Sequence, residues 1–216
     1  MKEIIGYSTL YNCDCKDLMA QYPDKHFDLA IVDPPFGGAV NKKVARTGGT
    51  WAAKYGTNIN KWDIVPDQAY FNELFRVSKY AIVCGGNYFQ LPSSRNFIIW
   101  QKHIPENFTM AMCEYLWTNI DGNAKIFKCA PQGTPTDKRF HPTQKPVALY
   151  KWLLSKYAKQ GDKILDTHFG SGSIAIACNE LGFNLTASEI DQDYFNAACL
   201  RVREANKQGD LFREAV

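Results

Sequence analysis

The sequence has no apolar segment long enough to cross a membrane, because no run approaches the roughly 20 residues that a spanning helix needs. Its first ten residues, MKEIIGYSTL, lack the long apolar core of a signal peptide. Internal repeats and low-complexity segments are also missing. Hydrophobic residues make up 45% and charged residues 22% of the chain, which excludes a disordered or fibrous class. We therefore expect a cytoplasmic protein whose 216 residues (1–216) form a single domain.

The seven cysteines include no C-x-x-C pair and are not accompanied by histidines at zinc-site spacing. An odd number of scattered cysteines argues against a disulfide framework. We expect reduced thiols that are mostly buried, and no metal site.

Short apolar segments alternate with segments of helical periodicity along most of the chain. Seven strands are predicted, at residues 8–13, 27–33, 80–86, 96–101, 114–120, 163–169 and 184–190. Four helices are predicted, at residues 68–78, 146–158, 173–182 and 192–206. This alternation predicts an α/β fold with a mostly parallel sheet covered on both faces, which binds ligands beyond the carboxyl ends of its strands.

One such strand end is the stretch FDLAIVDPPFGG, residues 27–38, where a buried strand runs into Asp33, Pro34, Pro35 and Phe36. The prolines fix φ and lack an N–H, so the chain leaves the sheet in one stiff direction with carbonyl groups free to accept hydrogen bonds. The prolines could equally well only end the strand, with Asp33 solvated. This stretch alone does not choose between the two interpretations.

A second strand end carries a glycine-rich turn, DTHFGSGSIAIA, residues 166–177. Gly170, Gly172 and Ala175 have the spacing G-x-G-x-x-A, and Glu189 lies at the end of the next strand. Glycine lets the backbone approach a ligand closely, and an acid at that place can accept hydrogen bonds from both ribose hydroxyls. The pattern predicts a nucleoside site for either a nicotinamide cofactor or S-adenosylmethionine. The glycines could also merely form a tight turn.

Two features favour S-adenosylmethionine. Asp166, just before the glycines, could meet a cationic amino-acid group, whereas a pyrophosphate favours an uncluttered helix N-terminus. An Asp followed by prolines also suits methylation of an exocyclic amine. If the Asp33 carboxylate and the Pro34 carbonyl each accept an amine hydrogen, the nitrogen can pyramidalise, while Phe36 stacks on the base. Such a base must be flipped out of its duplex.

Positive charge is concentrated in two segments rich in Gly, Thr, Asn and Pro. Residues 41–62 contain five Lys or Arg and no acid, and residues 124–145 contain five against Asp137. The net charge of the whole chain is only +3, so the remainder is net negative. The two segments are either solvated surface loops or contacts for a polyanion, and neighbouring aromatic residues favour nucleic acid.

Taken together, these motifs resemble the DNA amino-methyltransferases, which methylate adenine N6 or cytosine N4. DPPF at 33–36 is similar to their catalytic motif, DTHFGSGS at 166–173 to their cofactor loop, and SEID at 188–191 to their ribose-binding strand end. HPTQKP at 141–146 is similar to the segment that precedes the cofactor loop in members with a permuted motif order. The resemblance covers nearly the whole chain. It implies a Rossmann-like, circularly permuted methyltransferase fold with seven strands, the last of them antiparallel.

The resemblance also implies roles for individual residues. Asp33, Pro34, Pro35 and Phe36 would contact the target base. The cofactor, S-adenosylmethionine, would be held by Asp14, Thr143, Gln144, Lys145, Asp166, His168, Phe169, Gly170, Gly172, Ser173, Glu189 and Ile190. Double-stranded DNA would be contacted by basic loops at about 37–62 and 121–145, through Lys42, Lys43, Arg46, Lys54, Lys138 and Arg139.

The chain departs from the family at Thr167 and His168, where Pro-Phe is usual. His168 is interpreted either as a ring packed under the cofactor or as an ordinary loop residue. Asp33 at the first position of the catalytic motif is associated in the family mainly with adenine, so the expected product is N6-methyladenine. Cytosine N4, an RNA or protein amine, and a non-catalytic nucleic-acid-binding role are the alternatives. The sequence leaves open whether the protein forms a homodimer and whether a cognate restriction enzyme accompanies it.

Overall fold

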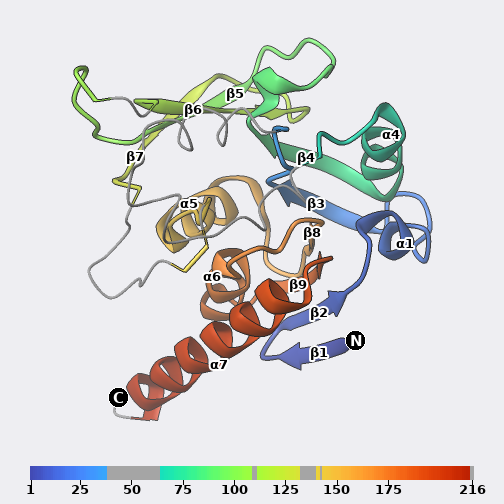
Figure 1. Cartoon of the computed structure of the whole chain (residues 1–216), viewed down its shortest axis with the longest axis vertical. Coiled ribbons are helices and arrows are strands. Elements are labelled where there is room, and N and C mark those ends of the chain that lie inside the picture. Colours follow the sequence, from blue (N-terminus) through green and yellow to red (C-terminus); the bar gives the residue numbers. More distant parts are fainter. Residues whose placement is uncertain (38–63, 109–110, 132–139, 142, 215–216) are drawn as a thin grey trace.

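The described part of the chain is built around one sheet. The structure, a computed structural model, describes residues 1–37, 64–108, 111–131, 140–141 and 143–214 (Figure 1). Its strands are β1 (Lys2–Ile5), β2 (Ser8–Asn12), β3 (Phe27–Val32), β4 (Ser78–Cys84), β5 (Phe97–Gln101), β6 (Cys113–Thr118), β7 (Lys125–Lys128), β8 (Lys163–Asp166) and β9 (Asn184–Glu189). Its helices are α1 (Cys15–Met19), α4 (Gln68–Val77), the 3-10 turn η3 (Gly86–Tyr88), α5 (Val147–Tyr157), α6 (Ser173–Leu181) and α7 (Gln192–Glu214).

The sheet has the order β1-β2-β9-β8-β3-β4-β6-β5-β7 and is mostly parallel, as predicted. β6 runs antiparallel to β4 and β5, and β1 runs antiparallel to β2. The family resemblance implied an antiparallel strand of this kind. Because β9, β8 and β3 are adjacent and parallel, their carboxyl ends meet at one edge of the sheet.

The strand count differs from the prediction, since the described residues form nine strands and not seven. The two additional strands, β1 and β7, have four residues each and lie at the two edges of the sheet. Each is largely exposed, with Ile4 and Ile126 more than half accessible. Segments this short and this exposed carry too little periodicity to be recognised from sequence.

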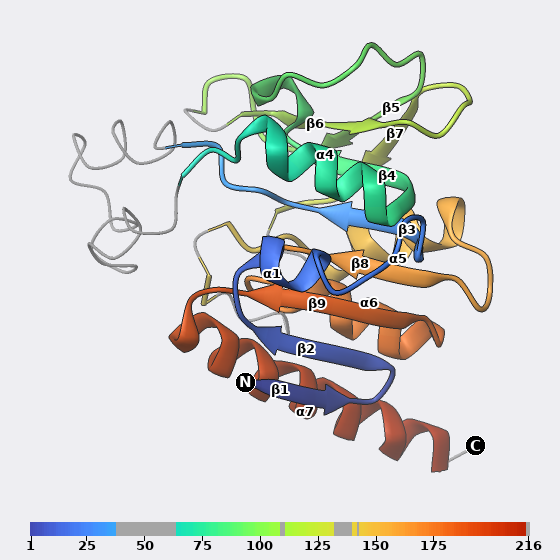
Figure 2. The ribbon, with the colours of Figure 1, turned by 90° about the vertical axis from the view of Figure 1, so that its right-hand side faces the viewer.

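Helices cover both faces of the sheet, and each face has its own core. Figure 2 shows α1 and α4 in front of the sheet and α5, α6 and α7 behind it. Alternate residues of β3 supply the two cores: Leu29 and Ile31 pack with the helices behind, Ala30 and Val32 with those in front. A strand buried on both faces is read as a continuous apolar run, which explains why β3 was predictable.

Two further expectations concerned the burial of the cysteine thiols and membrane-spanning segments. The thiols are free, but only Cys84, Cys178 and Cys199 are buried, so the expectation that most would be buried is wrong. Within the described residues, no helix is long and apolar enough to cross a bilayer.

Candidate active site at the carboxyl edge of the sheet

A cavity of about 640 Å³ opens where β3, β8 and β9 end. It brings together motifs that are far apart in the sequence. Most of the predicted catalytic and cofactor-binding residues line it: Asp14, Asp33, Pro34, Pro35, Phe36, Thr143, Gln144, Lys145, His168, Phe169, Gly170, Glu189 and Ile190. The other three, Asp166, Gly172 and Ser173, do not line the cavity and lie behind its wall.

Asp33, directly after β3, is held by a lysine from the HPTQKP segment. Lys145 Nζ lies 2.5 Å from Asp33 Oδ2, and the lysine side chain is only 4% exposed. The other oxygen, Oδ1, is buried and has no hydrogen-bond partner among the described residues. Burial raises the pKa of the Asp33 carboxyl, and the Lys145 ammonium opposes this shift. The strand tip therefore carries a restrained carboxylate with one unused acceptor.

Phe36 at the end of the DPPF motif packs against the residues that follow β4. Its ring stacks on Tyr88 with centroids 4.7 Å apart and an interplanar angle of 24°. Gly85 permits this approach, because a Cβ built on it would lie 2.2 Å from the Phe36 ring. One face of Phe36 is thus covered by protein.

The glycine loop and Glu189 are joined by hydrogen bonds. Gly170 N donates to Glu189 Oε2 over 2.8 Å, and Asp191 N donates to Oε1 over 2.9 Å. Gly170 has φ +51°, in the left-handed region that favours glycine. Burial raises the pKa of the Glu189 carboxyl, while the two backbone donors lower it. The carboxylate is oriented by backbone groups and retains lone pairs for further donors.

Asp166, at the end of β8, is almost fully buried, and its Oδ1 accepts a hydrogen bond from His168 N. Its pKa is raised to about 8, mainly by burial and also by the nearby carboxylates of Asp33 and Glu189. Asp166 lies beneath the cavity wall.

Thr167 and His168, the two departures from the family pattern, form a hydrogen-bonded chain with α4. Thr167 Oγ1 lies 2.6 Å from Tyr70 Oη and 2.9 Å from His168 Nδ1. Burial lowers the pKa of His168 to about 4, so its ring is neutral at physiological pH. The structure places this neutral ring in the cavity wall.

The remaining predicted residues support the rim or the base of the site. Asp14 caps α1 by accepting a hydrogen bond from Lys16 N. Gln144 Oε1 accepts from Phe140 N, and Thr143 bonds to His141 Nδ1. Ser173 Oγ donates to the carbonyl of Lys145 over 2.7 Å and so ties α6 to the HPTQKP segment. Gly172 precedes α6 with φ +77°.

Comparison with known proteins agrees with this geometry. The profile of the N6/N4 family, described as DNA methylase, matches residues 99–199. The type II methyltransferase M.HinfI of Haemophilus influenzae is 27% identical over 256 residues, covering 94% of this chain and 71% of M.HinfI. M.HpaI of Haemophilus parainfluenzae is 34% identical over a shorter stretch, 29% of this chain and 20% of M.HpaI. The chain is therefore homologous to these two type II methyltransferases. The resemblance seen in the sequence is thereby confirmed.

Solved structures confirm the methyltransferase fold. The M1.HpyAVI–SAM complex superposes with a TM-score of 0.59 at 20% identity, covering 90% of this chain and 98% of that one. The PvuII DNA methyltransferase, named as cytosine-N4-specific, gives a TM-score of 0.61 at 12% identity, covering 94% of this chain and 91% of its own.

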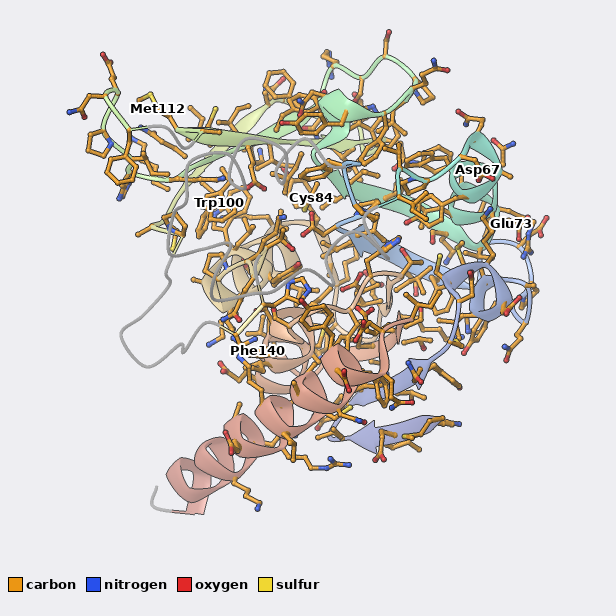
Figure 3. The ribbon with its side chains drawn as sticks, in the orientation of Figure 1. Asp67, Glu73, Cys84, Trp100, Met112 and Phe140 are labelled. Atoms are coloured by element: carbon orange, nitrogen blue, oxygen red, sulfur yellow. The ribbon has the colours of Figure 1, made fainter. Side chains whose placement is uncertain are left out.

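Several residues that line the cavity or support it were not predicted. Tyr70 and Asp67 of the α4 region also line the cavity, and Figure 3 labels Asp67 at the start of that helix. Glu114 lies behind the cavity on β6 and contacts Lys145. No sequence motif marks these positions, because they reach the site only through the packing of α4 and the register of β6.

The predicted DNA-contacting residues lie outside the described part of the chain. Residues 38–63 and 132–139 contain all six: Lys42, Lys43, Arg46, Lys54, Lys138 and Arg139. Among the described residues, no group of three or more His, Cys, Asp or Glu could hold a metal ion.

Proposed function

We propose that this protein is an S-adenosylmethionine-dependent DNA methyltransferase that methylates the N6 amine of a flipped adenine. The observation that carries the proposal is the shared cavity, which is lined by Asp33, the glycine loop and Glu189, with Oδ1 of Asp33 lacking a hydrogen-bond partner among the described residues. The family match and the homology to type II methyltransferases support the chemistry at a DNA amine.

The residues around the cavity fit the proposed cofactor. Its volume lies in the range of about 300–1,000 Å³ typical of small-molecule sites. Glu189 would accept hydrogen bonds from the ribose hydroxyls with its remaining lone pairs, and Gly170 lets the backbone approach the ligand. The buried acid Asp166 would favour a cationic amino-acid group by its field. When bound, S-adenosylmethionine supplies an electrophilic methyl group on a sulfonium.

Asp33 and Pro34 act on the target amine. The amine is a poor nucleophile because its lone pair is delocalised into the ring. Asp33 Oδ1 and the Pro34 carbonyl would each accept one amine hydrogen, which orients the nitrogen and lets it pyramidalise. The Lys145 ammonium favours the ionised form of the carboxyl and holds it through the other oxygen. Donation to Oδ1 would also satisfy an acceptor whose burial without a partner costs about 1–3 kcal/mol.

The substrate is proposed to be double-stranded DNA with the target base extruded, since a stacked base cannot reach the cavity. Phe36 remains the proposed stacking surface, through the face that Tyr88 does not cover. The basic residues at 42, 43, 46, 54, 138 and 139 would contact phosphates.

Adenine is favoured over cytosine because Asp33 stands where the family has Asp mainly in adenine enzymes. A purine also offers a larger face to Phe36. Cytosine N4 is the second candidate, because the PvuII enzyme named as cytosine-N4-specific has the same fold.

One experiment tests the proposal. The protein is incubated with cofactor carrying a labelled methyl group and a mixture of DNA, RNA and protein, and each fraction is digested and analysed by mass spectrometry. Label in N6-methyladenine of DNA is expected. Label only in N4-methylcytosine would change the base and leave the chemistry at Asp33, whereas label only in RNA or protein would overturn the proposed function.

A further inference from the structure

Behind the cavity, Asp33 belongs to a cluster of four charged side chains. Lys145 Nζ lies 2.5 Å from Asp33 Oδ2 and 3.3 Å from Glu114 Oε2. Glu114 Oε1 in turn lies 2.5 Å from Lys102 Nζ. The cluster therefore contains two cations and two anions in the order Asp33, Lys145, Glu114, Lys102, and its formal charge is zero.

The outer pair of this cluster comes from β5 and β6, outside all of the sequence motifs. Glu114 on β6 is opposite Trp100 on β5, and Lys102 follows β5 directly. The ammonium of Lys102 lies 5.1 Å from the centre of the Trp100 ring, which Figure 3 labels. Lys102 is 8% exposed, and neither Glu114 nor Lys102 lines the cavity. They cannot touch a ligand there, and they reach Asp33 only through Lys145 or through their charge.

The charges of Glu114 and Lys102 affect how readily Asp33 ionises. Lys145 interacts with two carboxylates, those of Asp33 and Glu114. The more completely Lys102 neutralises Glu114, the more weakly Glu114 attracts Lys145, and the more firmly Lys145 can hold Asp33. Consistent with this, the pKa of the Asp33 carboxyl is raised by the Glu114 charge and lowered by Lys102. The pKa of Glu114 itself is lowered, because the attraction of Lys145 and Lys102 outweighs the effect of its burial.

We propose that Glu114 and Lys102 are positioning residues for the target amine: together they set how firmly Lys145 holds Asp33 as a carboxylate with Oδ1 available. This inference rests on the proposed function, because it assigns to Asp33 the role of amine acceptor. It assigns a role in the reaction to Glu114 and Lys102, which lie outside all of the sequence motifs.

Other titratable groups also interact electrostatically with Asp33, and their effects on its titration must be distinguished from those of Glu114 and Lys102. They are Asp166, Tyr70, Cys84 and Tyr150. Burial raises the pKa of each, so the thiol and the two phenols stay neutral below pH 9, and Asp166 titrates near pH 8. Glu114 also interacts electrostatically with Cys84 and Tyr150, but both stay neutral in this pH range and so add no charge near Asp33.

The test measures the titration of Asp33 directly in the protein without cofactor, by ¹³C NMR of labelled aspartate carboxyls, with Asp33→Asn assigning the signal. Lys102→Met leaves the cluster with a net negative charge and should raise the pKa of Asp33 by about one unit. Glu114→Gln leaves a net positive charge and should lower it by a similar amount. The double variant Lys102→Met/Glu114→Gln restores neutrality and should return close to the unsubstituted protein. Lys79→Met, which breaks the exposed pair with Asp28, is the matched control and should cause no shift.

The same variants then report on the reaction. The acid limb of the pH profile of kcat should move with the measured pKa of Asp33, up in Lys102→Met and down in Glu114→Gln. Opposite shifts in the single variants with recovery in the double variant support the proposal, and the double variant also guards against a single variant that fails to fold. Shifts in the same direction, or no shift, would overturn it. Absence of DNA methylation by the unsubstituted protein would instead overturn the proposed function, so the two failures are distinguishable.

Discussion

Lys145 Nζ lies 2.5 Å from Asp33 Oδ2, so the HPTQKP segment and the DPPF motif meet through a buried ion pair. The resemblance placed Lys145 near the cofactor, and the structure adds a direct contact with Asp33 of the DPPF motif. Because this contact occupies one carboxylate oxygen only, Asp33 is held rigidly and still has an acceptor to offer. Two motifs that are far apart in the sequence therefore meet at the point where the chemistry is proposed.

Asp33 and Glu189 are expected to separate chemistry from cofactor binding. Asp33→Asn should reduce methyl transfer by at least about 100-fold, because the amine loses its charged acceptor, and should leave cofactor affinity nearly intact. Glu189→Ala should weaken cofactor binding by about 2–3 kcal/mol, since charge-assisted hydrogen bonds to the ribose are removed. Calorimetry of cofactor binding and single-turnover methyl transfer measure the two effects. The reverse ranking would refute this assignment of roles.

Stability has to be measured alongside activity in these variants. Asp33→Asn leaves Lys145 with one carboxylate fewer, and breaking a buried ion pair costs about 3–5 kcal/mol. The double variant Asp33→Asn/Lys145→Met removes both partners and is expected to recover much of this stability in denaturant unfolding. A double variant no more stable than Asp33→Asn would show that the unpaired Lys145 charge is not what destabilises Asp33→Asn.

Much of this organisation could be predicted from the sequence, for identifiable reasons. The inner strands are buried on both faces and are therefore read as apolar runs, as in β3 and β4. Proline after β3 and glycine after β8 mark where those strands end, so Asp33 and Asp166 could be placed at the carboxyl edge.

The parts that escaped prediction depend on contacts between distant residues. The five-residue helix α1 and the edge strand β7 are too short to show a period. Nothing in the sequence distinguishes Glu114 from an ordinary strand residue. The pairing of β5 with β6 brings it to Lys102, and the segment before α5 brings Lys145 to Glu114. Register and packing of this kind are set by the whole fold.

The basic segment at 41–62 is expected to set DNA affinity through its attraction to phosphates. Replacing Lys42, Lys43 and Arg46 by Gln should weaken binding to all sequences and reduce the slope of log K against log salt by about 0.9 for each phosphate that is no longer neutralised. Lys156→Gln, at an exposed position on α5, is the control and should leave the slope unchanged. An unchanged slope in the triple variant would identify these residues as solvated surface charges. Fluorescence anisotropy with a labelled duplex at several salt concentrations provides the measurement.

His168 is expected to act as a neutral ring and not as a base. Its pKa is lowered to about 4 by burial, so it carries no charge between pH 6 and 9. His168→Phe keeps an aromatic ring, removes the hydrogen bond to Thr167, and should leave the shape of the pH profile of kcat unchanged. Disappearance of an acid limb in this variant would mean that His168 moves a proton during the reaction.

Asp166 should make cofactor binding depend on pH. Its pKa of about 8 means that the carboxyl is mostly protonated at pH 7 in the free protein. A cationic group bound nearby favours the carboxylate and lowers its pKa. Binding at pH 7 should therefore release nearly one proton, and cofactor affinity should rise between about pH 6 and 8. The α-amino group of the ligand has an ordinary pKa of about 7.7–8.0 and must stay protonated, so affinity should fall again at higher pH. Asp166→Asn cannot release the proton and should retain only the falling limb. Calorimetry in two buffers of different ionisation enthalpy counts the protons, and equal counts for the two proteins would show that Asp166 does not sense the bound cation.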